Sequence, residues 1–432
     1  MKSVLIITYY WPPASGPGVQ RWLKFSKYLL EFGWTPVILT VENGSYVNTD
    51  KELLKDIPKE LKIYQTKTLE PFLIYNALRG KKGKAIEVGM GNIKGKPSFF
   101  KRLSTYIRSN FFVPDARIGW NRFAFPKALK LIEKENIELV ITTGPPHSTH
   151  LIGRNIKNKV NLPWIADFRD PWTSIYYENY LTRSKKSSLK NKTLEQDTIE
   201  NSDVLLVVSK GMKEEFGSEN PKIHCLPNGY DEDDLPEKIH QASDVFNLAY
   251  IGNLKSNQNI VTLWEAVSEL DSEIENFKFC LSFTGNVHED IKTEIKKRTL
   301  EHLVVYKPFV KHSEAFRLMS EATLLYLPIP KSENNKLILT GKIFEYIASS
   351  SPILSLGPID GNAAEILKTC EREQMIDYDN KTAIKKVIKT LYLEWQQSEG
   401  MSFKHTSESY KQFSRKQLSR DLAQIMDHLI TQ

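Results

Sequence analysis

A lysine and a glutamate in the last third of the chain have the spacing of a ligand-binding helix start. Lys342 and Glu345 stand three residues apart in the run TGKIFEYIA, so a helix that begins after Gly341 places both on one face. Backbone N–H groups around Gly341 would suit a phosphate oxygen, and the glutamate could accept two neighbouring sugar hydroxyls. Diphosphate and ribose together make a nucleotide. The structural alternative is an amphipathic surface helix with an ordinary ion pair.

Two loops in the first half of the chain hold a second set of chemically capable residues. His147 lies in the loop GPPHSTH, and Asp167, Arg169 and Asp170 lie in the loop DFRDPW. Both loops follow predicted strands, and open α/β sheets bind ligands at the carboxyl ends of their strands. The imidazole could hydrogen-bond a sugar hydroxyl or an incoming group. Capping of the next helix by His147 and a salt-bridged turn are the structural alternatives.

A doubly wound sheet would place these loops at the carboxyl ends of its strands, and the sequence predicts two such sheets. Continuous apolar runs alternate with segments of helical periodicity, as in a parallel sheet covered on both faces. The predicted fold is therefore α/β, with two Rossmann-like doubly wound parallel-sheet domains that face each other across a cleft. The expected strands are residues 3–8, 35–41, 62–66, 138–142, 163–167 and 203–208 in the first half, and 246–251, 277–283, 303–306, 323–328 and 352–356 in the second.

The first glycine-rich loop opens a dinucleotide-type unit without its full signature. In YYWPPASGPGVQR, Gly16 and Gly18 are followed by Arg21 where the third glycine of the fingerprint belongs, and no acidic residue ends the second strand. An NAD site is not expected, and no cofactor is indicated.

A polar, acidic stretch at 231–244 marks the boundary between the two halves. We predict one Rossmann-like domain over residues 1–235, a second over 236–405, and a terminal helix within 406–432 that packs back across the domains.

Composition indicates a folded protein of a reducing compartment. The 432 residues are 41% apolar and 26% charged, with a net charge of +7. Three widely spaced cysteines indicate neither a disulfide framework nor a zinc site, and no apolar run is long enough to span a membrane. We therefore expect a cytoplasmic protein. The basic, aromatic segment 71–120 could lie against anionic lipid head groups as a peripheral contact. A plain buried helix is the alternative. The aromatic and basic residues that would make this contact are Lys96, Phe99, Phe100, Lys101, Arg102, Tyr106, Arg108, Phe111 and Phe112.

Taken in order, the motifs resemble glycosyltransferase family four, a retaining family of the two-Rossmann (GT-B) type, as found in bacterial surface-polysaccharide synthesis. The motifs are YYWPPASGPGVQR, ITTGPPHSTH, DFRDPW, DVLLVVSKGM, LPNGYD, YIGNL and TGKIFEYIASSSPIL, and they cover most of the chain. The resemblance implies a donor site made of Gly252, Asn253, Lys255, Thr340, Gly341, Lys342 and Glu345, catalytic roles for His147, Lys342 and Glu345, and an acceptor side made of Gly16, Gly18, Arg21, Asp167, Arg169 and Asp170. It also implies that the domain over residues 1–235 binds the acceptor, that the domain over 236–405 binds the nucleotide sugar, and that transfer proceeds with retention and without a metal.

The chain departs from the family pattern at two places. Leu337 stands where the first acid of the usual Glu-x7-Glu pair belongs, so that carboxylate is missing or comes from elsewhere, with Glu333 as a candidate. The loop after Ile251 has Lys255 but no arginine for the diphosphate. Lys336 or Lys342 could supply the remaining positive charge for the diphosphate. No acidic pair is placed to hold a divalent ion, so lysines and helix amides would have to neutralise the leaving diphosphate.

The expected activity is transfer of a sugar from a nucleotide sugar, such as a UDP- or GDP-sugar, to a glycan or lipid-linked acceptor in surface polysaccharide or glycolipid synthesis. A sugar-nucleotide 2-epimerase of the same fold is the enzymatic alternative, and it would need an acid and base pair and no acceptor. A basic-loop protein that binds nucleic acid is the other alternative. It is not favoured, because the basic residues cluster in two loops, at 79–101 and 183–192, and not along one aromatic stripe.

Overall fold

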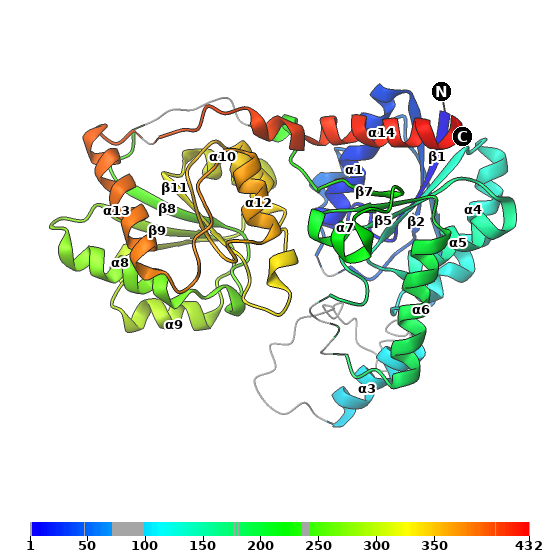
Figure 1. The fold of residues 1–432 in the computed structure, drawn as a ribbon, viewed down its shortest axis with the longest axis horizontal. Helices are drawn as coiled ribbons and strands as arrows, with labels where there is room; N and C mark the ends of the chain where they lie inside the picture. The colour runs from blue at the N-terminus through cyan, green and yellow to red at the C-terminus, as the bar shows by residue number, and fades with distance from the viewer. Residues whose placement is uncertain are drawn as a thin grey trace. The chain divides into compact units, whose positions relative to one another are not determined.

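The structure is a computed structural model that describes residues 2–46, 48–70, 99–175, 178, 181–235, 242–401 and 403–431. Its contacts divide the chain into two compact domains (Figure 1). The first consists of residues 1–228 and 415–432, and the second of residues 229–414. The segment 71–98, which holds most of the predicted basic excursion, and the linker residues 236–241 lie outside the described residues.

The first domain is built on a seven-stranded parallel sheet with the order β3-β2-β1-β4-β5-β6-β7. The strands are β1 (Lys2–Ile7), β2 (Trp34–Val41), β3 (Lys62–Thr66), β4 (Leu139–Gly144), β5 (Trp164–Phe168), β6 (Val204–Val207) and β7 (Ile223–Cys225). The strand order reverses direction between β1 and β4. The loops after these two strands therefore diverge and open the edge of the sheet where doubly wound folds bind ligands.

Alternate residues of β1 feed two separate cores, because successive side chains of a strand point to opposite faces. Val4 and Ile6 pack with α1 (Pro17–Leu29) and α14 (Arg415–Thr431), which lie side by side (Figure 1). Leu5 and Ile7 pack on the other face with α4 (Asn121–Lys134) and α5 (Ser148–Val160). The remaining helices are α3 (Phe99–Phe111), α6 (Lys185–Asn201) and α7 (Lys210–Gly217).

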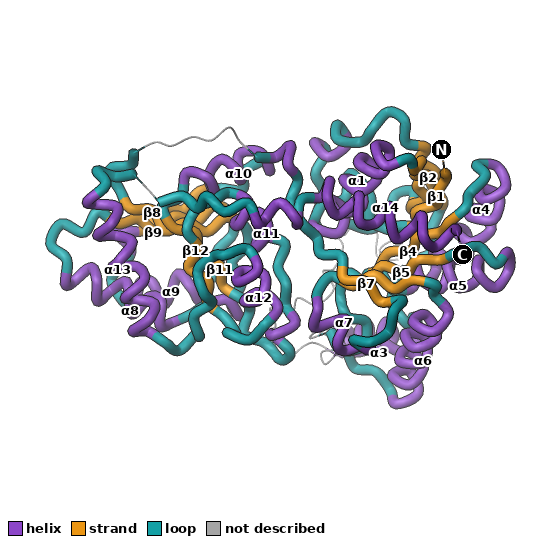
Figure 2. The backbone as a smooth tube through the Cα atoms, turned by 45° about the horizontal axis from the view of Figure 1, so that its top comes forward, coloured by secondary structure: helices purple, strands orange, loops and turns teal. Residues whose placement is uncertain are grey.

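The second domain repeats this plan with five parallel strands in the order β10-β9-β8-β11-β12, shown in orange in Figure 2. The strands are β8 (Phe246–Ile251), β9 (Phe279–Thr284), β10 (Val304–Lys307), β11 (Leu324–Pro328) and β12 (Ile353–Leu356). One face is covered by α8 (Val261–Glu273), α9 (Glu289–Lys297) and α13 (Lys381–Gln397), and the other by α10 (His312–Glu321), α11 (Lys342–Ala348) and α12 (Asn362–Thr369). The order reverses between β8 and β11, so the loops after these strands open its ligand edge.

The predicted α/β class with two doubly wound parallel sheets is confirmed. The sequence patterns did not identify α7 or α12, two helices of eight residues each. Helices this short offer little more than two turns of periodicity to recognise.

Candidate active site

Three residues from separate segments meet at the ligand edge of the second domain. Gly252, directly after β8, has φ +126°, and a Cβ added there would lie 2.5 Å from Nζ of Lys342. Gly285, directly after β9, has φ +112°, and its Cβ would lie 2.5 Å from the carbonyl oxygen of Gly252. Both positions favour glycine for their backbone conformation, and at Gly285 a Cβ would also meet backbone atoms. The two glycines let the lysine at the start of α11 lie against the backbone of the β8 loop.

The Lys342 ammonium is a half-buried cation without a close anionic partner. Nζ lies 5.6 Å from the ring centroid of Tyr250. Within the described residues it makes neither an ion pair nor a hydrogen bond. Burial lowers the pKa of Lys342; the charge of Glu345 opposes that shift, and the charge of Lys255 adds to it. Such a site favours an anionic ligand, because an anion would restore the interactions that burial removed.

The loop after β8 is held in place by hydrogen bonds to its neighbours. The Gly252 N–H donates to the Thr284 carbonyl at 2.7 Å, and the Leu254 N–H donates to the Asn286 carbonyl at 2.8 Å. The Gln258 side chain donates to the Pro328 carbonyl at 3.1 Å. These bonds join the carboxyl ends of β8, β9 and β11. Lys255 projects from this braced loop as an exposed side chain.

The other residues predicted on the donor side have mixed surroundings. Asn253 is exposed, and its carbonyl accepts a hydrogen bond from the Tyr250 hydroxyl at 3.0 Å. The Thr340 hydroxyl is buried and has no partner among the described residues. Glu345 is half-buried on α11, while Phe344 and Ile347 face the core as predicted. Gly341 is the residue before the first turn of this helix.

The two residues suggested as replacements for missing family features lie on the surface. Lys336 forms an exposed ion pair with Asp360 at 2.5 Å, so it is already neutralised. Glu333 is exposed in the loop between β11 and α11. Of the three lysines proposed for the diphosphate, Lys255, Lys336 and Lys342, only Lys342 is half-buried.

In the first domain, Asp167 is the centre of a buried network. Its carboxylate accepts hydrogen bonds from Arg21 at 2.9 Å, from the Trp22 indole at 2.7 Å and from the Thr143 hydroxyl at 2.8 Å. The side chains of Arg21 and Asp167 are both 0% exposed. They tie α1 to β4 and β5. These two residues, predicted on the acceptor side, position the loops and do not reach the surface.

Arg169 lies above this network and in contact with the glycine loop. Its Nε donates to the Thr143 hydroxyl at 2.9 Å, and Nη2 donates to the Pro145 carbonyl. A Cβ at Gly18 would lie 1.2 Å from Nη1 of Arg169, so a side chain there would displace the guanidinium. Burial lowers the pKa of Arg169, while Asp167 and Asp170 oppose that shift. The Asp170 side chain is exposed beside it.

His147 precedes α5 but does not cap it. Its ring stacks on Trp172, with centroids 4.7 Å apart and planes 10° apart. The first residue of α5 is instead hydrogen-bonded by Asp115, whose carboxylate accepts from the N–H and the hydroxyl of Ser148, both at 2.8 Å. The helix-capping alternative for His147 is therefore not what the structure has.

Both ring nitrogens of His147 are buried and lack a hydrogen-bond partner among the described residues. Burial lowers its pKa well below the ordinary value, and the charges of His150 and Arg169 act in the same direction, so the ring is neutral at pH 7. Protein atoms cover these nitrogens in this arrangement, and the catalytic role of His147 stays a prediction.

His150 is a neighbour that the sequence analysis missed. Its Nδ1 lies 2.9 Å from the Thr142 hydroxyl, which also accepts a hydrogen bond from the Trp164 indole at 2.8 Å. Burial lowers the pKa of His150 to about 3. A Cβ at Gly144 would lie 2.5 Å from Nε2 of His150. The HSTH spacing, which puts the two histidines one helical turn apart, was the available signal.

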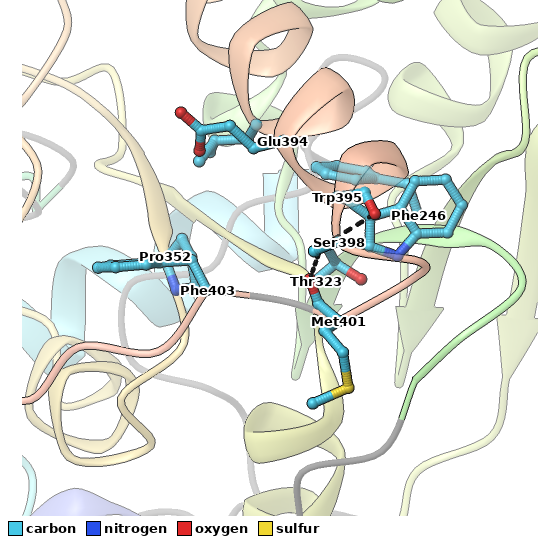
Figure 3. Close-up of a pocket in the computed structure, with 9 residues that line it drawn as sticks. Phe246, Thr323, Pro352, Glu394, Trp395, Ser398, Met401 and Phe403 are labelled. Carbon is cyan, nitrogen blue, oxygen red and sulfur yellow. Dashed lines mark hydrogen bonds between the residues drawn. The ribbon is translucent and has the colours of Figure 1, made fainter.

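A pocket of about 270 Å³ lies elsewhere in the second domain (Figure 3). It is lined by residues at the starts of three strands, Phe246, Thr323 and Pro352, and by Trp395, Met401 and Phe403. Strands β8, β11 and β12 all run away from it toward the edge where Gly252 and Lys342 meet. The pocket and the candidate donor site are therefore at opposite ends of the sheet.

Within the described residues, no group of three or more His, Cys, Asp or Glu side chains is placed to hold a metal ion. None of the described helices is long and apolar enough to cross a membrane.

Comparison with known proteins agrees with this architecture. Residues 83–234 match the family model described as Glycosyltransferase Family 4. This match lies mostly within the first domain and ends just inside the second, whereas the motif resemblance extends over most of the chain. No curated protein matches the chain at a significant level.

Solved structures share the fold over the whole length at low identity. Sucrose-phosphate synthase from Thermosynechococcus elongatus has a TM-score of 0.62 at 13% identity, with 100% of each chain covered. A mutant of S. aureus TarM in complex with fondaparinux, alpha-GlcNAc-glycerol and UDP has a TM-score of 0.59 at 11% identity, again with 100% of each chain covered. A putative UDP-N-acetylglucosamine 2-epimerase from Listeria monocytogenes has 0.54 at 12%, covering 100% of this chain and 98% of that one. The chain therefore has the two-domain GT-B fold, and its residues 83–234 resemble glycosyltransferase family four.

Proposed function

We propose that the second domain binds the diphosphate and ribose of a nucleotide sugar, such as a UDP- or GDP-sugar. The observation that carries this proposal is the Lys342 ammonium, a half-buried cation that lies against Gly252 without an ion-pair partner among the described residues. A diphosphate would neutralise it, and Lys255 in the braced loop would add a second positive charge. Glu345, one turn along the same helix, would accept hydrogen bonds from the ribose hydroxyls.

We propose further that the first domain binds a glycan or lipid-linked acceptor, and that transfer proceeds with retention and without a metal in surface polysaccharide or glycolipid synthesis. As the glycosidic bond to the diphosphate breaks, negative charge grows on the leaving oxygen. Lys342 and Lys255 would stabilise that charge in place of a divalent ion. The TarM structure, solved with UDP and alpha-GlcNAc-glycerol, supports this type of donor and acceptor by analogy of fold.

A 2-epimerase remains the alternative, because a protein named as a putative enzyme of that type has the same fold. An epimerase needs an acid and base pair but no acceptor. The two histidines nearest the first-domain site are both buried and neutral, which does not favour proton transfer at the sugar.

The donor assignment predicts a selective thermal shift that depends on Glu345. The full chain is incubated with UDP-, GDP- and ADP-sugars, with and without EDTA, and its melting temperature and the release of free nucleoside diphosphate are measured. One donor class should raise the melting temperature, because it binds only the folded protein. Glu345→Ala should lose most of this shift.

The control is Glu394→Ala, at the rim of the pocket on the opposite edge of the sheet, which should retain the shift. A full shift in Glu345→Ala would remove the ribose assignment. A changed sugar configuration without any acceptor would favour the epimerase, and loss of transfer in EDTA would remove the metal-free proposal.

We also propose that the first domain contacts an anionic membrane surface through the joined ends of α3 and α6. Arg183 donates hydrogen bonds to the carbonyls of Ser109 and Pro114, both at 2.8 Å, which fixes the end of α3 against the start of α6. Phe111 is 74% exposed and Leu189 is 69% exposed on these helix ends. Nearby exposed cations on α6 are Lys185, Lys186 and Lys190. Apolar side chains flanked by lysines are typical of interfacial membrane contacts. Lys96 and the side chains of Phe99, Phe100, Lys101 and Arg102, part of the same prediction, lie outside the described residues.

Replacing both Phe111 and Leu189 by aspartate should weaken binding to anionic vesicles by about tenfold or more, since each change removes an apolar anchor and adds a repelled charge. Sedimentation with phosphatidylglycerol and phosphatidylcholine vesicles measures this. Phe309→Asp, at a residue 70% exposed in the second domain, is the matched control. Equal and negligible binding of the unaltered protein to both vesicle types would exclude the contact.

A further inference from the structure

Two tyrosines, Tyr10 and Tyr46, lie together at the ligand edge of the first domain. Tyr10 follows β1 and Tyr46 follows β2, its neighbour in the sheet. Both side chains are half-buried, and their ring centroids are 6.3 Å apart with planes at 56°. Each ring therefore keeps some surface for a ligand at the carboxyl ends of adjacent strands.

The loops that hold these rings are bonded to each other. Ala14 and Thr49 form an antiparallel bridge, and the Ser15 N–H donates to the Asn48 carbonyl at 3.2 Å. A Cβ at Gly44 would lie 2.9 Å from Cε1 of Tyr46, so this glycine allows the ring to lie against its own loop. The rings are thus presented by a braced pair of loops.

A buried network supports the tyrosines from below. Tyr9 is fully buried, and its ring meets Tyr10 edge to face with centroids 5.1 Å apart. The Tyr9 hydroxyl and Arg117 both bind the carboxylate of Glu70. Arg117 also lies over the Tyr9 ring, 5.3 Å from its centroid. This buried network limits the motion of the Tyr10 ring.

Polar groups suited to sugar hydroxyls lie beside the rings. Tyr10 follows β1 and Arg169 follows β5, with β4 between these two strands, so both residues stand at the same carboxyl edge of the sheet. Arg169 has donors, and the exposed Asp170 has acceptors. With the buried pair of Arg21 and Asp167 beneath them, the charges of this group sum to zero. A neutral ligand therefore meets no net charge here.

We infer that Tyr10 and Tyr46 form a stacking floor for a neutral sugar ring of the acceptor, in which one aromatic ring lies against the sugar face and the other, inclined by 56°, lies against its edge, with Arg169 and Asp170 hydrogen-bonding its hydroxyls. The inference rests on the proposed function and specifies its acceptor class. The C–H bonds on one face of a sugar ring carry partial positive charge, and aromatic faces carry negative charge, so the two surfaces attract. Hydroxyls at the rim of the sugar need a donor and an acceptor together, which the Arg169 and Asp170 pair provides.

Saturation-transfer NMR on the full chain tests this with methyl glucoside, methyl galactoside and methyl mannoside, and with glucuronate and glucose 6-phosphate as anionic probes. At least one neutral glycoside should bind through the protons of one ring face. Tyr10→Leu and Tyr46→Leu should each weaken that binding by about two- to tenfold, as expected for loss of one aromatic contact. Tyr10→Phe and Tyr46→Phe keep the ring and should bind like the unaltered protein.

Every other result overturns the inference: no binding by any glycoside at millimolar concentration, equal binding by the leucine variants, or stronger binding by the anionic probes. Donor binding is measured on the same samples by thermal shift. A normal donor shift with no effect of the leucine changes would refute the stacking floor and leave the proposed transferase intact. Absence of any donor shift would instead count against the proposed function. Melting temperatures of the leucine variants, compared with those of the phenylalanine variants, identify any loss through misfolding.

Discussion

Lys342→Met should lower kcat/KM for sugar transfer by about 10²- to 10³-fold, the range expected when one group that stabilises a leaving charge is removed. The ammonium is half-buried and lies against Gly252, at the edge of the sheet proposed to bind the diphosphate. Methionine has a similar length and apolar surface but no charge. Nucleotide-sugar affinity, measured by thermal shift or calorimetry, should fall together with turnover.

The same change should leave the fold as stable or more stable, because burial opposes the charge. The pKa of Lys342 lies below its ordinary value of 10.5, so the unfolded chain binds this proton more readily than the folded one. The resulting destabilisation is complete below the lowered pKa and disappears as the pH rises through that pKa to 10.5. The melting temperature of the unaltered protein should therefore rise with pH across this window, and that of Lys342→Met should lack this rise.

Lys389→Met on α13 provides the comparison, since that lysine is exposed near Glu273 at 3.6 Å. It should leave turnover unchanged. Undiminished transfer in Lys342→Met would refute the role given to this cation.

Asp167→Ala should destabilise the first domain by about 3–5 kcal/mol, the usual cost of leaving a buried charge without its partner. Arg21 is fully buried, and besides Asp167 it has the Pro227 carbonyl, at 2.6 Å, as a hydrogen-bond acceptor. The change also removes the acceptor for Trp22 and Thr143. Hydrogen exchange of amides in β5 and α1 reports the loss within this domain, without requiring the two domains to unfold together.

A double change, Arg21→Met with Asp167→Leu, should recover much of the stability, because it removes both charges and fills the space with apolar groups. Glu52→Ala breaks an exposed pair with Lys55 and should cost less than about 1 kcal/mol. If Asp167→Ala unfolded no more easily than Glu52→Ala, the network would not be the support described for Arg169.

Much of the fold could be predicted because its signals are local. The apolar run at Phe246–Ile251 is a strand with those bounds, and β3 likewise matches its predicted range. Such runs are buried on both faces, which leaves a continuous pattern in the sequence. The loops that follow could therefore be assigned to the carboxyl edges of the sheets.

The surroundings of the individual side chains could not be predicted. No spacing shows that Arg169, 151 positions later, lies against Gly18. Likewise, His147 looked like a surface ligand group, but Trp172 and His150 enclose it. Contacts between residues far apart in sequence depend on how the elements pack, and composition or periodicity does not encode them in a readable form.

The position of α14 has a consequence for synthesis on the ribosome. Leu418, Leu422 and Met426 complete the core that also contains Trp22 and Ile38, although the whole second domain is translated between these two groups. The second domain emerges as one uninterrupted stretch and can fold while translation continues. Until α14 is translated, the nascent first domain exposes the apolar face that α14 later covers. During this interval chaperones would have the largest apolar surface to bind.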